Sequence, residues 1–284
     1  MPVGIAGGRE AHVSSTASLQ GQVAVITGAG KGIGRALVER LAVEGMSIGL
    51  IARTASDVEG AAQAARDAGV GVVAVAGDVG DRATVEGFLG QVETELGAVD
   101  LLVNNAARSA SWTGEKFWEV DPDDWWSRVE TNLRGPVLTC RTVLPGMVAR
   151  GTGRIVNMNS LAGAIPLPMT DGAYPVSKSG LFRFTDQLAS QLRGTGVVVL
   201  DLSPGQVATQ PGSEAFTPPG GWTPVERICD LTVAVAQGRL DEWNGRFVHV
   251  LDDLDDLLAR TDEVAAVDGR TLRLRAGWDG DPRV

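Results

Sequence analysis

A tyrosine and a lysine four residues apart form the pair in this sequence most suited to acid/base chemistry. Tyr174 and Lys178 belong to the segment YPVSK, and Tyr174 is the single tyrosine among 284 residues. In a helix this spacing places both side chains on one face. A free phenol titrates at about pH 10, and a neighbouring ammonium would lower its pKa by stabilising the phenolate. Such a phenol could protonate a carbonyl oxygen or deprotonate an alcohol. From the spacing alone, two unrelated residues on one helix face remain an open alternative.

Two further polar residues could join this pair. Ser160 follows an expected strand at 153–158. It would lie at the sheet edge where ligands bind in open α/β folds, and its hydroxyl could stabilise a developing oxyanion. Asn132, within TNLRG, could hold a water or a main-chain carbonyl near Lys178 and so extend a proton path. An ordinary hydrogen-bonded helix residue explains Asn132 equally well.

A glycine-rich turn supplies a second candidate site. The apolar run VAVIT (23–27) leads directly into TGAGKGIG (27–34), and a helix is expected over 32–45. Glycine permits a tight turn and lets backbone amides approach an anion, and a helix N-terminus favours a phosphate there. This order of elements is typical of dinucleotide binding, and a tight turn without a ligand is the weaker alternative. The candidate residues are Gly28, Gly30, Lys31, Gly32, Ile33 and Gly34.

The end of the second expected strand indicates which dinucleotide would bind. NAD-binding folds place an acidic residue there, which holds the ribose 2′-hydroxyl. Here the strand ends in Ala52 and Arg53, and Lys31 adds positive charge in the glycine turn. Both cations would attract a 2′-phosphate, so the sequence predicts NADP(H) rather than NAD(H). The alternative is that they are solvated surface charges. Asp78 could accept a hydrogen bond from the adenine amino group or cap the next helix.

Apolar runs and helical periodicity alternate along the chain, which predicts an α/β fold with a parallel sheet covered on both faces. Strands are expected at 23–27, 46–52, within 70–79, and at 99–106, 153–158, 196–202 and 245–250. Helices are expected at 32–45, at 56–69 with Ser56 as N-cap, and at 82–97, 129–150 and 173–194.

Composition narrows the possible functions. Hydrophobic residues make up 44% of the chain and charged residues 21%, so it can bury a sizeable core. The formal net charge of −10 argues against general binding to nucleic acid or anionic membranes. The isolated Cys140 and Cys229 indicate a reduced, cytoplasmic protein, and with only His12 and His249 beside them we expect no metal site. No apolar run reaches the roughly 18 residues of a membrane-spanning helix.

Together these motifs resemble the short-chain dehydrogenase/reductase family. The chain carries TGAGKGIG for TGxxxGxG, DV at 78–79, NNAA at 104–107 for NNAG and TN at 131–132. It continues with NS at 159–160, YPVSK for YxxxK and PGQVAT at 204–209 for PGxxxT. The match covers roughly residues 20–250 in the family's order. Two departures are Ala107 in place of the final glycine of NNAG, and the missing asparagine that many relatives carry before PG.

The resemblance implies a Rossmann-type, three-layer α/β/α fold with strand order 3-2-1-4-5-6-7. It implies Tyr174 as the acid/base residue and Lys178 as its activator and ribose ligand. It also implies Ser160 as the carbonyl stabiliser and Asn132 as the residue that completes a proton relay. Arg53 falls on the position that NADP-preferring members use.

The resemblance adds further cofactor-binding residues. Asn105 is similar to the family's sheet-stabilising asparagine, which also lies close to the cofactor, and Thr209 to the threonine that contacts the nicotinamide carboxamide. The implied cofactor-binding set, besides the glycine turn and Arg53, is Asp78, Val79, Asn105, Ala106, Tyr174, Lys178, Pro204, Gly205, Val207 and Thr209.

Three segments divide the chain. We expect a flexible tail at 1–20, a dinucleotide-binding and catalytic domain at 21–250 with a Gly/Pro-rich lid at about 206–222, and an extension at 251–284. The extension begins LDDLDDLLAR, with Leu251, Leu254, Leu257 and Leu258 on one helical face. Its four aspartates could suggest calcium, but they lack the EF-hand glycine and glutamate, and a solvated helix start is the better interpretation.

The variable segments predict the substrate class. Candidate specificity segments are 107–121, 162–173 and the lid, and their apolar residues include Trp112, Phe117, Trp118, Ile165, Leu167, Met169, Phe216 and Trp222. They favour a small hydrophobic carbonyl or alcohol substrate, although packing among themselves or against another subunit is an equal alternative. The leading hypothesis is an NADPH-dependent carbonyl reductase or alcohol dehydrogenase that forms a homodimer or homotetramer. An imine reductase and a non-catalytic NADP-binding sensor are the alternatives.

Overall fold

The computed structural model describes residues 17–110, 114–166, 171–209, 218 and 220–273. Several residues named above lie outside this set, namely His12, Trp112, Leu167, Met169 and Phe216, as do most of the expected tail and much of the expected lid.

Within the described residues, seven parallel strands form one sheet in the order β3-β2-β1-β4-β5-β6-β7. This confirms the predicted fold class and strand order. The runs are short and mostly buried, as parallel strands covered on both faces require. Their bounds are Val23–Thr27 (β1), Ser47–Ala52 (β2), Val72–Ala76 (β3), Leu101–Asn104 (β4), Gly153–Met158 (β5), Val197–Ser203 (β6) and Phe247–His249 (β7).

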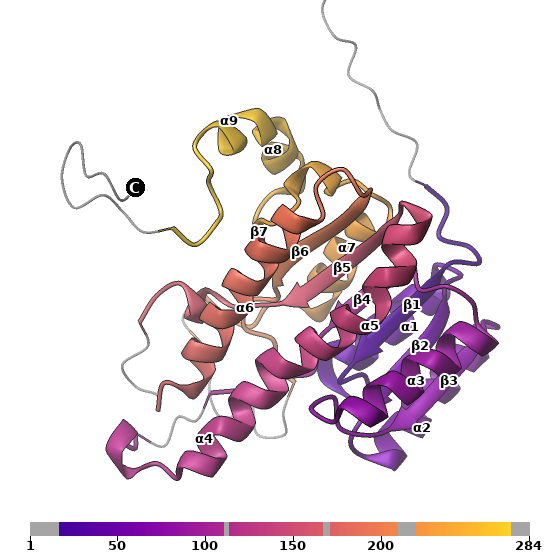
Figure 1. Ribbon diagram of the computed structural model, residues 1–284, viewed down its shortest axis with the longest axis horizontal. Helices are drawn as coiled ribbons and strands as arrows, with labels where there is room; N and C mark the ends of the chain where they lie inside the picture. The colour runs from indigo at the N-terminus through magenta and orange to yellow at the C-terminus, as the bar shows by residue number, and fades with distance from the viewer. Residues whose placement is uncertain (1–16, 111–113, 167–170, 210–217, 219, 274–284) are drawn as a thin grey trace, which may run out of the picture.

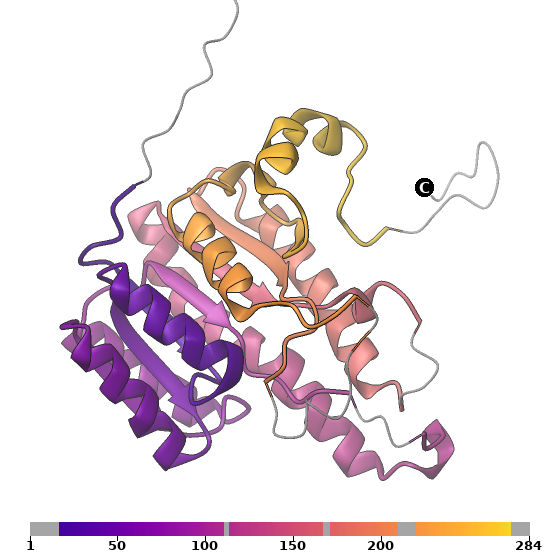
Figure 2. The same ribbon diagram turned by 180° about the vertical axis from the view of Figure 1, so that it is seen from behind.

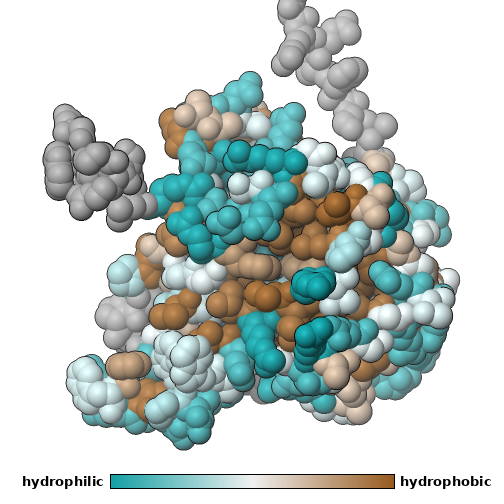
Figure 3. All heavy atoms as spheres, viewed as in Figure 1, coloured by the Kyte–Doolittle hydropathy of each residue, from teal (hydrophilic) through white to brown (hydrophobic). Residues whose placement is uncertain are grey.

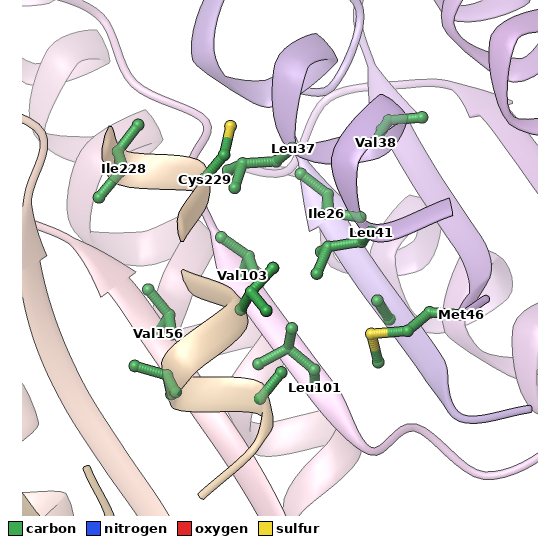
Figure 4. Packing of buried hydrophobic residues seen from close by; sticks show 14 of the residues in the cluster. Ile26, Leu37, Val38, Leu41, Met46, Leu101, Val103, Val156, Ile228 and Cys229 are labelled. Carbon is green, nitrogen blue, oxygen red and sulfur yellow. The ribbon is translucent and has the colours of Figure 1, made fainter. Parts of the chain in front are cut away.

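Helices cover both faces of this sheet (Figures 1 and 2). One face carries α1 (Gly32–Val43), α2 (Ala55–Asp67) and α7 (Val225–Ala236). The other carries α3 (Arg82–Glu95), α5 (Gly135–Arg150) and α6 (Ala173–Gln191). Figure 4 shows the packing on the first face, where Cys229 of α7 lies next to Leu37 of α1, with Val103 of β4 beneath them.

The helix expected at 129–150 is longer and less regular than predicted. It begins with α4 (Pro122–Val129), passes through a π-helical segment, η2 (Glu130–Arg134), and continues as α5. Asp121 caps α4 by accepting a hydrogen bond from Asp123 N at 2.9 Å, and proline takes the first helical position. Asp-Pro is a normal helix start, so the true N-terminus was readable from the sequence.

One predicted N-cap was wrong, and one helix was missed. Thr54, not Ser56, precedes α2, and its side chain makes no capping hydrogen bond. Helix α7 was not predicted, although Ile228, Thr232 and Val235 recur at helical spacing and are buried. The preceding Gly/Pro-rich stretch obscured its start at Pro224.

The C-terminal extension packs against the domain. It forms α8 (Leu254–Ala259) and α9 (Thr261–Ala266), drawn in yellow in Figure 1. Leu257 is buried in the core, whereas Leu251 is exposed and lies before α8, so only part of the predicted apolar face packs. Phe247 N donates to Arg270 O at 2.9 Å, which pairs the extension with the edge strand β7.

The acidic run at the start of the extension caps a helix. Asp253 is the N-cap of α8 and accepts a hydrogen bond from Asp256 N at 2.9 Å. In the described part of the chain, no three His, Cys, Asp or Glu residues are grouped in a way that could hold a metal ion.

The first described residues already pack against the domain. Leu19 is buried in the core and Gly21 N donates to Gly45 O at 3.0 Å, so the packed chain starts before the expected boundary at Gly21. No helix among the described residues is long and apolar enough to span a membrane.

Candidate active site

Tyr174 and Ser160 meet beyond the carboxyl end of β5. Tyr174 is the second residue of α6, and Gly172, with a φ of 84°, lies at the N-cap. Ser160 begins a short turn at 161–163, where its Oγ accepts a hydrogen bond from Ala162 N at 3.2 Å. Ser160 lies close enough to hydrogen-bond to the phenol and lower its pKa.

Lys178 is buried, and it lies on the same face of α6 as Tyr174, as the spacing predicted. Its Nζ lies 5.6 Å from the centroid of the Tyr174 ring and donates a hydrogen bond to Met158 O at 2.7 Å. The bond to Met158 anchors the ammonium to β5. An ammonium has three N–H donors, so Lys178 can still donate hydrogen bonds to another group. Tyr174, Lys178 and Ser160 are therefore brought together by α6 and the end of β5.

Burial corrects one expectation about the phenol. Burial raises the pKa of Tyr174 above its usual value, and hydrogen bonding from Ser160 only partly lowers it. A lowering of the Tyr174 pKa by the Lys178 ammonium, which the sequence predicted, is not among the causes of this shift. Burial lowers the pKa of Lys178 to about 8. Desolvation disfavours the charged form of both groups. The Tyr174 phenol is therefore neutral, and the Lys178 ammonium loses its proton more easily than an exposed lysine.

Asn132 lies in η2 and holds the chain that follows β4. Its Oδ1 accepts from Arg108 N at 2.7 Å, and its Nδ2 donates to Arg108 O at 3.0 Å and to Ser177 Oγ at 3.0 Å. Asn132 thus contacts the neighbour of Lys178 rather than its ammonium. Its part in a proton relay stays a prediction.

The glycine turn is shaped partly by protein packing. A Cβ on Gly28 would lie 2.7 Å from Ala106 Cα, and one on Gly34 would lie 2.3 Å from Gly28 O. A Cβ on Gly30 would meet Asp57 Cβ at 2.7 Å, which brings a carboxylate beside the turn that the sequence reading did not consider.

Gly32 lies where the glycine turn (27–34) comes close to the segment 204–209. It has a φ of 56°, and a Cβ there would lie 3.0 Å from Thr209 Cβ. The adjacent N-cap of α1, Lys31, makes no capping hydrogen bond, and the first turn, which includes Ile33, carries no acidic residue. Uncapped N–H groups with a neighbouring cation favour an anion, so these residues fit the pyrophosphate of a dinucleotide.

Asn105 and Ala106 tie β4 to the glycine turn. Asn105 Nδ2 donates to Thr27 O at 2.9 Å and to Gly28 O at 3.2 Å. The main-chain N atoms of Asn105 and Ala106 both donate to Thr27 Oγ1 at 3.0 Å. Asn105 therefore joins the end of β4 to the glycine turn, and its role beside the cofactor stays a prediction.

Of the four residues expected to bind the adenosine half of the cofactor, three are exposed to solvent and Val79 is buried. Arg53 and Lys31 are exposed, and neither forms an ion pair within 4.0 Å with the described residues. Asp78 is exposed and its Oδ1 accepts from Gly80 N at 2.8 Å, so it shapes the turn before α3, while Asp81 caps that helix. The side chain of Val79 is buried in the core.

The segment 204–209 leaves β6 and faces the glycine turn through Thr209. Gly205 has a φ of 69°, and a Cβ there would lie 2.5 Å from Thr223 Oγ1. Gln206 O accepts a hydrogen bond from Thr223 N at 2.7 Å, which joins the two ends of the expected lid. Pro204 and Val207 are half-buried beside this junction.

Sequence reasoning missed an ion pair that holds the start of α6. Asp171, three residues before Tyr174, pairs with Arg128 of α4 and accepts from Ala173 N at 3.0 Å. Trp125 Nε1 also donates to Asp171 O at 3.2 Å. An aspartate shortly before an expected helix was the available signal, but its distant partner was not visible in the sequence.

Sequence reasoning also missed Asp201, a buried carboxylate on β6. Burial raises the pKa of Asp201 to about 7, while Asn159, Thr185 and Lys178 lower it. A single acidic residue within the apolar run VVVLDLS was the signal that could have identified it.

A doubly wound parallel sheet whose glycine turn and Ser-Tyr-Lys group lie at the carboxyl ends of the strands defines a dinucleotide-binding oxidoreductase. The sequence model described as short chain dehydrogenase matches residues 22–218. The chain therefore belongs to the short chain dehydrogenase family, whose members use a nicotinamide cofactor.

Relatives and solved structures agree with this membership. A short chain dehydrogenase of Emericella variicolor is 35% identical over 277 residues, which cover 93% of each chain. A metagenomic short-chain oxidoreductase solved with NADP is 31% identical, with a TM-score of 0.67, covering 78% of this chain and 93% of that one. An NAD⁺-bound xylitol dehydrogenase is 25% identical, with a TM-score of 0.74 and coverage of 82% and 98%. Structures of this fold thus occur with either nucleotide.

Proposed function

We propose that this protein is an NADPH-dependent reductase of a carbonyl group on a hydrophobic small molecule, with Tyr174 as the acid/base residue. The observation that carries the proposal is the arrangement of Ser160 and Lys178 around the Tyr174 phenol, with Lys178 Nζ 5.6 Å from the ring centroid. A protein that only bound the nucleotide would have no use for a half-buried phenol held between a hydroxyl and an ammonium.

The proton chemistry follows from these side chains. The raised pKa of Tyr174 keeps the phenol protonated at neutral pH, so it can donate a proton to a substrate oxygen. Ser160 offers a second hydrogen bond to that oxygen as negative charge develops on it. The Lys178 ammonium then stabilises the phenolate that remains. In the oxidation of an alcohol the same groups act in the opposite order.

The cofactor would lie between the glycine turn and Thr209. When bound, NADPH supplies the hydride for the carbonyl carbon. Lys31 and Arg53, which have no ion pair with the described residues, would hold the 2′-phosphate, and Lys178 a ribose hydroxyl. Asp57 beside Gly30 is the feature that favours NAD(H) instead. A lower KM for NADH than for NADPH would contradict the preference.

Exposed apolar side chains beside the site support a hydrophobic substrate. Leu161 and Ile165, one and five residues after Ser160, are exposed. Phe117 and Trp118 are exposed as well, and the Phe117 ring stacks edge-on against Trp125, 6.5 Å away between centroids. Trp125 in turn bonds to Asp171 at the start of α6. Turnover of polyols alone would contradict this substrate class.

Tyr174→Phe tests the catalytic assignment. The variant keeps the ring above Lys178 but removes the acidic proton, so we expect turnover to fall by about 100-fold or more. NADPH binding, measured by fluorescence titration, should be preserved. A screen of NADPH oxidation over ketones, aldehydes and imines first identifies a substrate for the wild type. Unchanged turnover in the variant would refute the role of Tyr174.

A further inference from the structure

A chain of buried polar side chains crosses the middle of the sheet. Thr139 Oγ1 donates to Asn104 Oδ1 at 2.6 Å, and Asn104 Nδ2 donates to Asn157 Oδ1 at 2.8 Å. Asn157 Nδ2 donates to Thr185 Oγ1 at 2.9 Å, and Thr185 Oγ1 donates to Asp201 Oδ1 at 2.9 Å. All five side chains are buried. Asn104, Asn157 and Asp201 are register neighbours on β4, β5 and β6.

The direction of these bonds matters. Every donor in the chain points toward Asp201, and the chain ends on an oxygen of its carboxyl group. An ionised carboxylate only accepts hydrogen bonds, and a bond to a charged acceptor is stronger than a neutral one. Three consecutive strands thus carry polar residues where a parallel sheet normally carries apolar ones, and the arrangement stabilises a buried negative charge.

Lys178 reaches the strand next to Asp201, because its Nζ bonds to Met158 O and Met158 is the register neighbour of Leu202. The negative charge of Asp201 raises the pKa of Lys178 against the effect of burial. Lys178 and Thr185 lie two turns apart on the sheet-facing side of α6, and Thr185 is the residue bonded to Asp201. No ion pair within 4.0 Å joins Lys178 to Asp201 among the described residues, so the two charges interact without contact. Asn159 lowers the pKa of Asp201 as well, and its buried Nδ2 has no hydrogen-bond partner in the described structure.

Other ionisable groups near Asp201 do not replace this interaction. Asp186 on α6 raises the pKa of Asp201. Arg154 on β5 is paired with Asp241 at 2.7 Å. His249 on β7 accepts a hydrogen bond from Leu251 N at 3.1 Å, and burial lowers its pKa.

We propose that Asp201 is a positioning residue that keeps Lys178 protonated and thereby supports the stabilisation of the Tyr174 phenolate by Lys178. The proposal rests on the function proposed above. A buried lysine without a counter-charge tends to lose its proton. Asp201 supplies that counter-charge from β6, the strand next to β5. Lys178 therefore keeps its proton while its Nζ bonds to Met158 O and lies near the ring of Tyr174.

Asp201→Asn removes the charge while keeping an oxygen that can accept from Thr185. The chain has three lysines, Lys31, Lys116 and Lys178, so a protein with ¹³C-labelled lysine gives few side-chain NMR signals to titrate. We expect the midpoint of Lys178 to fall by about one pH unit in the variant, because an attractive negative charge is lost. The midpoints of the exposed Lys31 and Lys116 should not move. Identical Lys178 midpoints in wild type and variant would overturn the proposal.

The pH profile of carbonyl reduction gives a second readout. The Lys178 charge is present below its pKa and is lost above it, so loss of ammonium sets an alkaline limit on turnover. Asp201→Asn should move that limit to lower pH, with about a tenfold loss of kcat on the alkaline side for a shift of one unit. Asp241→Asn, which removes one carboxylate paired with Arg154, is the matched control and should leave the limit unchanged.

Two further variants keep the outcomes distinct. If Asp201→Asn does not fold, Thr185→Val removes the donor that stabilises the carboxylate, and the Lys178 midpoint should fall in the same direction. A Tyr174→Phe enzyme that retains turnover refutes the proposed function, whatever the lysine titration shows. A normal Tyr174→Phe result combined with an unmoved Lys178 midpoint refutes the role of Asp201 alone.

Discussion

At the scale of single residues, the chemistry of Tyr174 depends on burial that spacing cannot report. The YxxxK spacing and the strand before Ser160 were enough to predict that Ser160, Tyr174 and Lys178 lie together. The sign of the pKa shift on Tyr174 was not, because burial raises the pKa more than Ser160 lowers it. Asp201, which we propose keeps Lys178 charged, lies 23 positions further along the chain. It acts on Lys178 by electrostatic attraction and not by direct contact.

Arg53 carries the residue-scale prediction on cofactor choice. Arg53→Asp should raise the KM for NADPH by about 10- to 100-fold, because hydrogen bonds to a charged group contribute about 1.5–3 kcal/mol. The KM for NADH should change less, since that nucleotide lacks the phosphate. Steady-state kinetics with both cofactors measure the effect.

Arg66→Asp is the control for this substitution. Arg66 lies in the last turn of α2 and pairs with Glu59 at 2.7 Å, away from the glycine turn. If Arg53→Asp and Arg66→Asp give the same KM ratio for the two cofactors, Arg53 does not select NADPH.

At the scale of elements, the start of α6 is held by its neighbour α4. Arg128 pairs with Asp171, and both side chains are largely buried, 11% and 3% exposed. Arg128 also bonds to Asp124 at 2.5 Å, and Asp124 bonds to Arg108 at 2.8 Å. A charged network thus links the loop after β4, helix α4 and the turn that places Tyr174.

Arg128→Met should therefore damage both stability and turnover. Removing one partner of a buried pair leaves an uncompensated charge on Asp171, which we expect to lower the free energy of unfolding by about 3 kcal/mol. Turnover should fall because Asp171 accepts a hydrogen bond from Ala173 N, at the first residue of the helix that carries Tyr174. Urea unfolding and kcat measure the two effects, and the Arg128→Met/Asp171→Asn double variant should recover part of the stability.

Arg134→Met is the matched control, because Arg134 lies one turn and a half further on and pairs with Glu130 at 3.9 Å in solvent. Its unfolding free energy should change by less than about 1 kcal/mol. A similar loss in the Arg134 and Arg128 variants would show that the ion pair with Asp171 has no special role.

The strands were easier to predict from the sequence than the helices. Short apolar runs bounded by glycine predicted all seven strands, since a parallel strand buried on both faces has little other composition available. Helix α7 was missed because the Pro and Gly residues before it resemble loop signals. The start of α4 at Asp121-Pro122 was missed although it carries an ordinary helix-start signal. The π-helical segment around Asn132 has no sequence signal that we recognise.

At the scale of the whole molecule, the C-terminal extension protects an edge of the sheet. β7 is the last strand, and an open edge strand offers unpaired backbone groups. Arg270 O accepts from Phe247 N on that edge, and Arg273 reaches Asp186 of α6 at 2.9 Å. The sequence shows the acidic helix start of the extension, but it does not show the strand edge that the extension covers.

One face of the molecule stays partly apolar. Figure 3 shows hydrophobic spheres gathered across the middle of the face on which α5 and α6 lie. Val137 and Val148 of α5 are 39% and 42% exposed, and Val176 of α6 is 51% exposed. Val137 and Val148 are eleven residues apart, which puts them on the same side of the helix. We propose that this face joins two copies of the chain.

The double substitution Val137→Asp/Val148→Asp tests that assembly by placing like charges at the proposed contact. Sedimentation should show the wild type as a dimer or tetramer and the variant shifted toward the 29.6 kDa monomer, because unpaired buried charges destabilise an interface. Val43→Asp is the control, since Val43 is 75% exposed on α1 at the opposite face of the sheet and should leave the assembly intact. A monomeric wild type, or dissociation caused equally by Val43→Asp, would contradict the proposal.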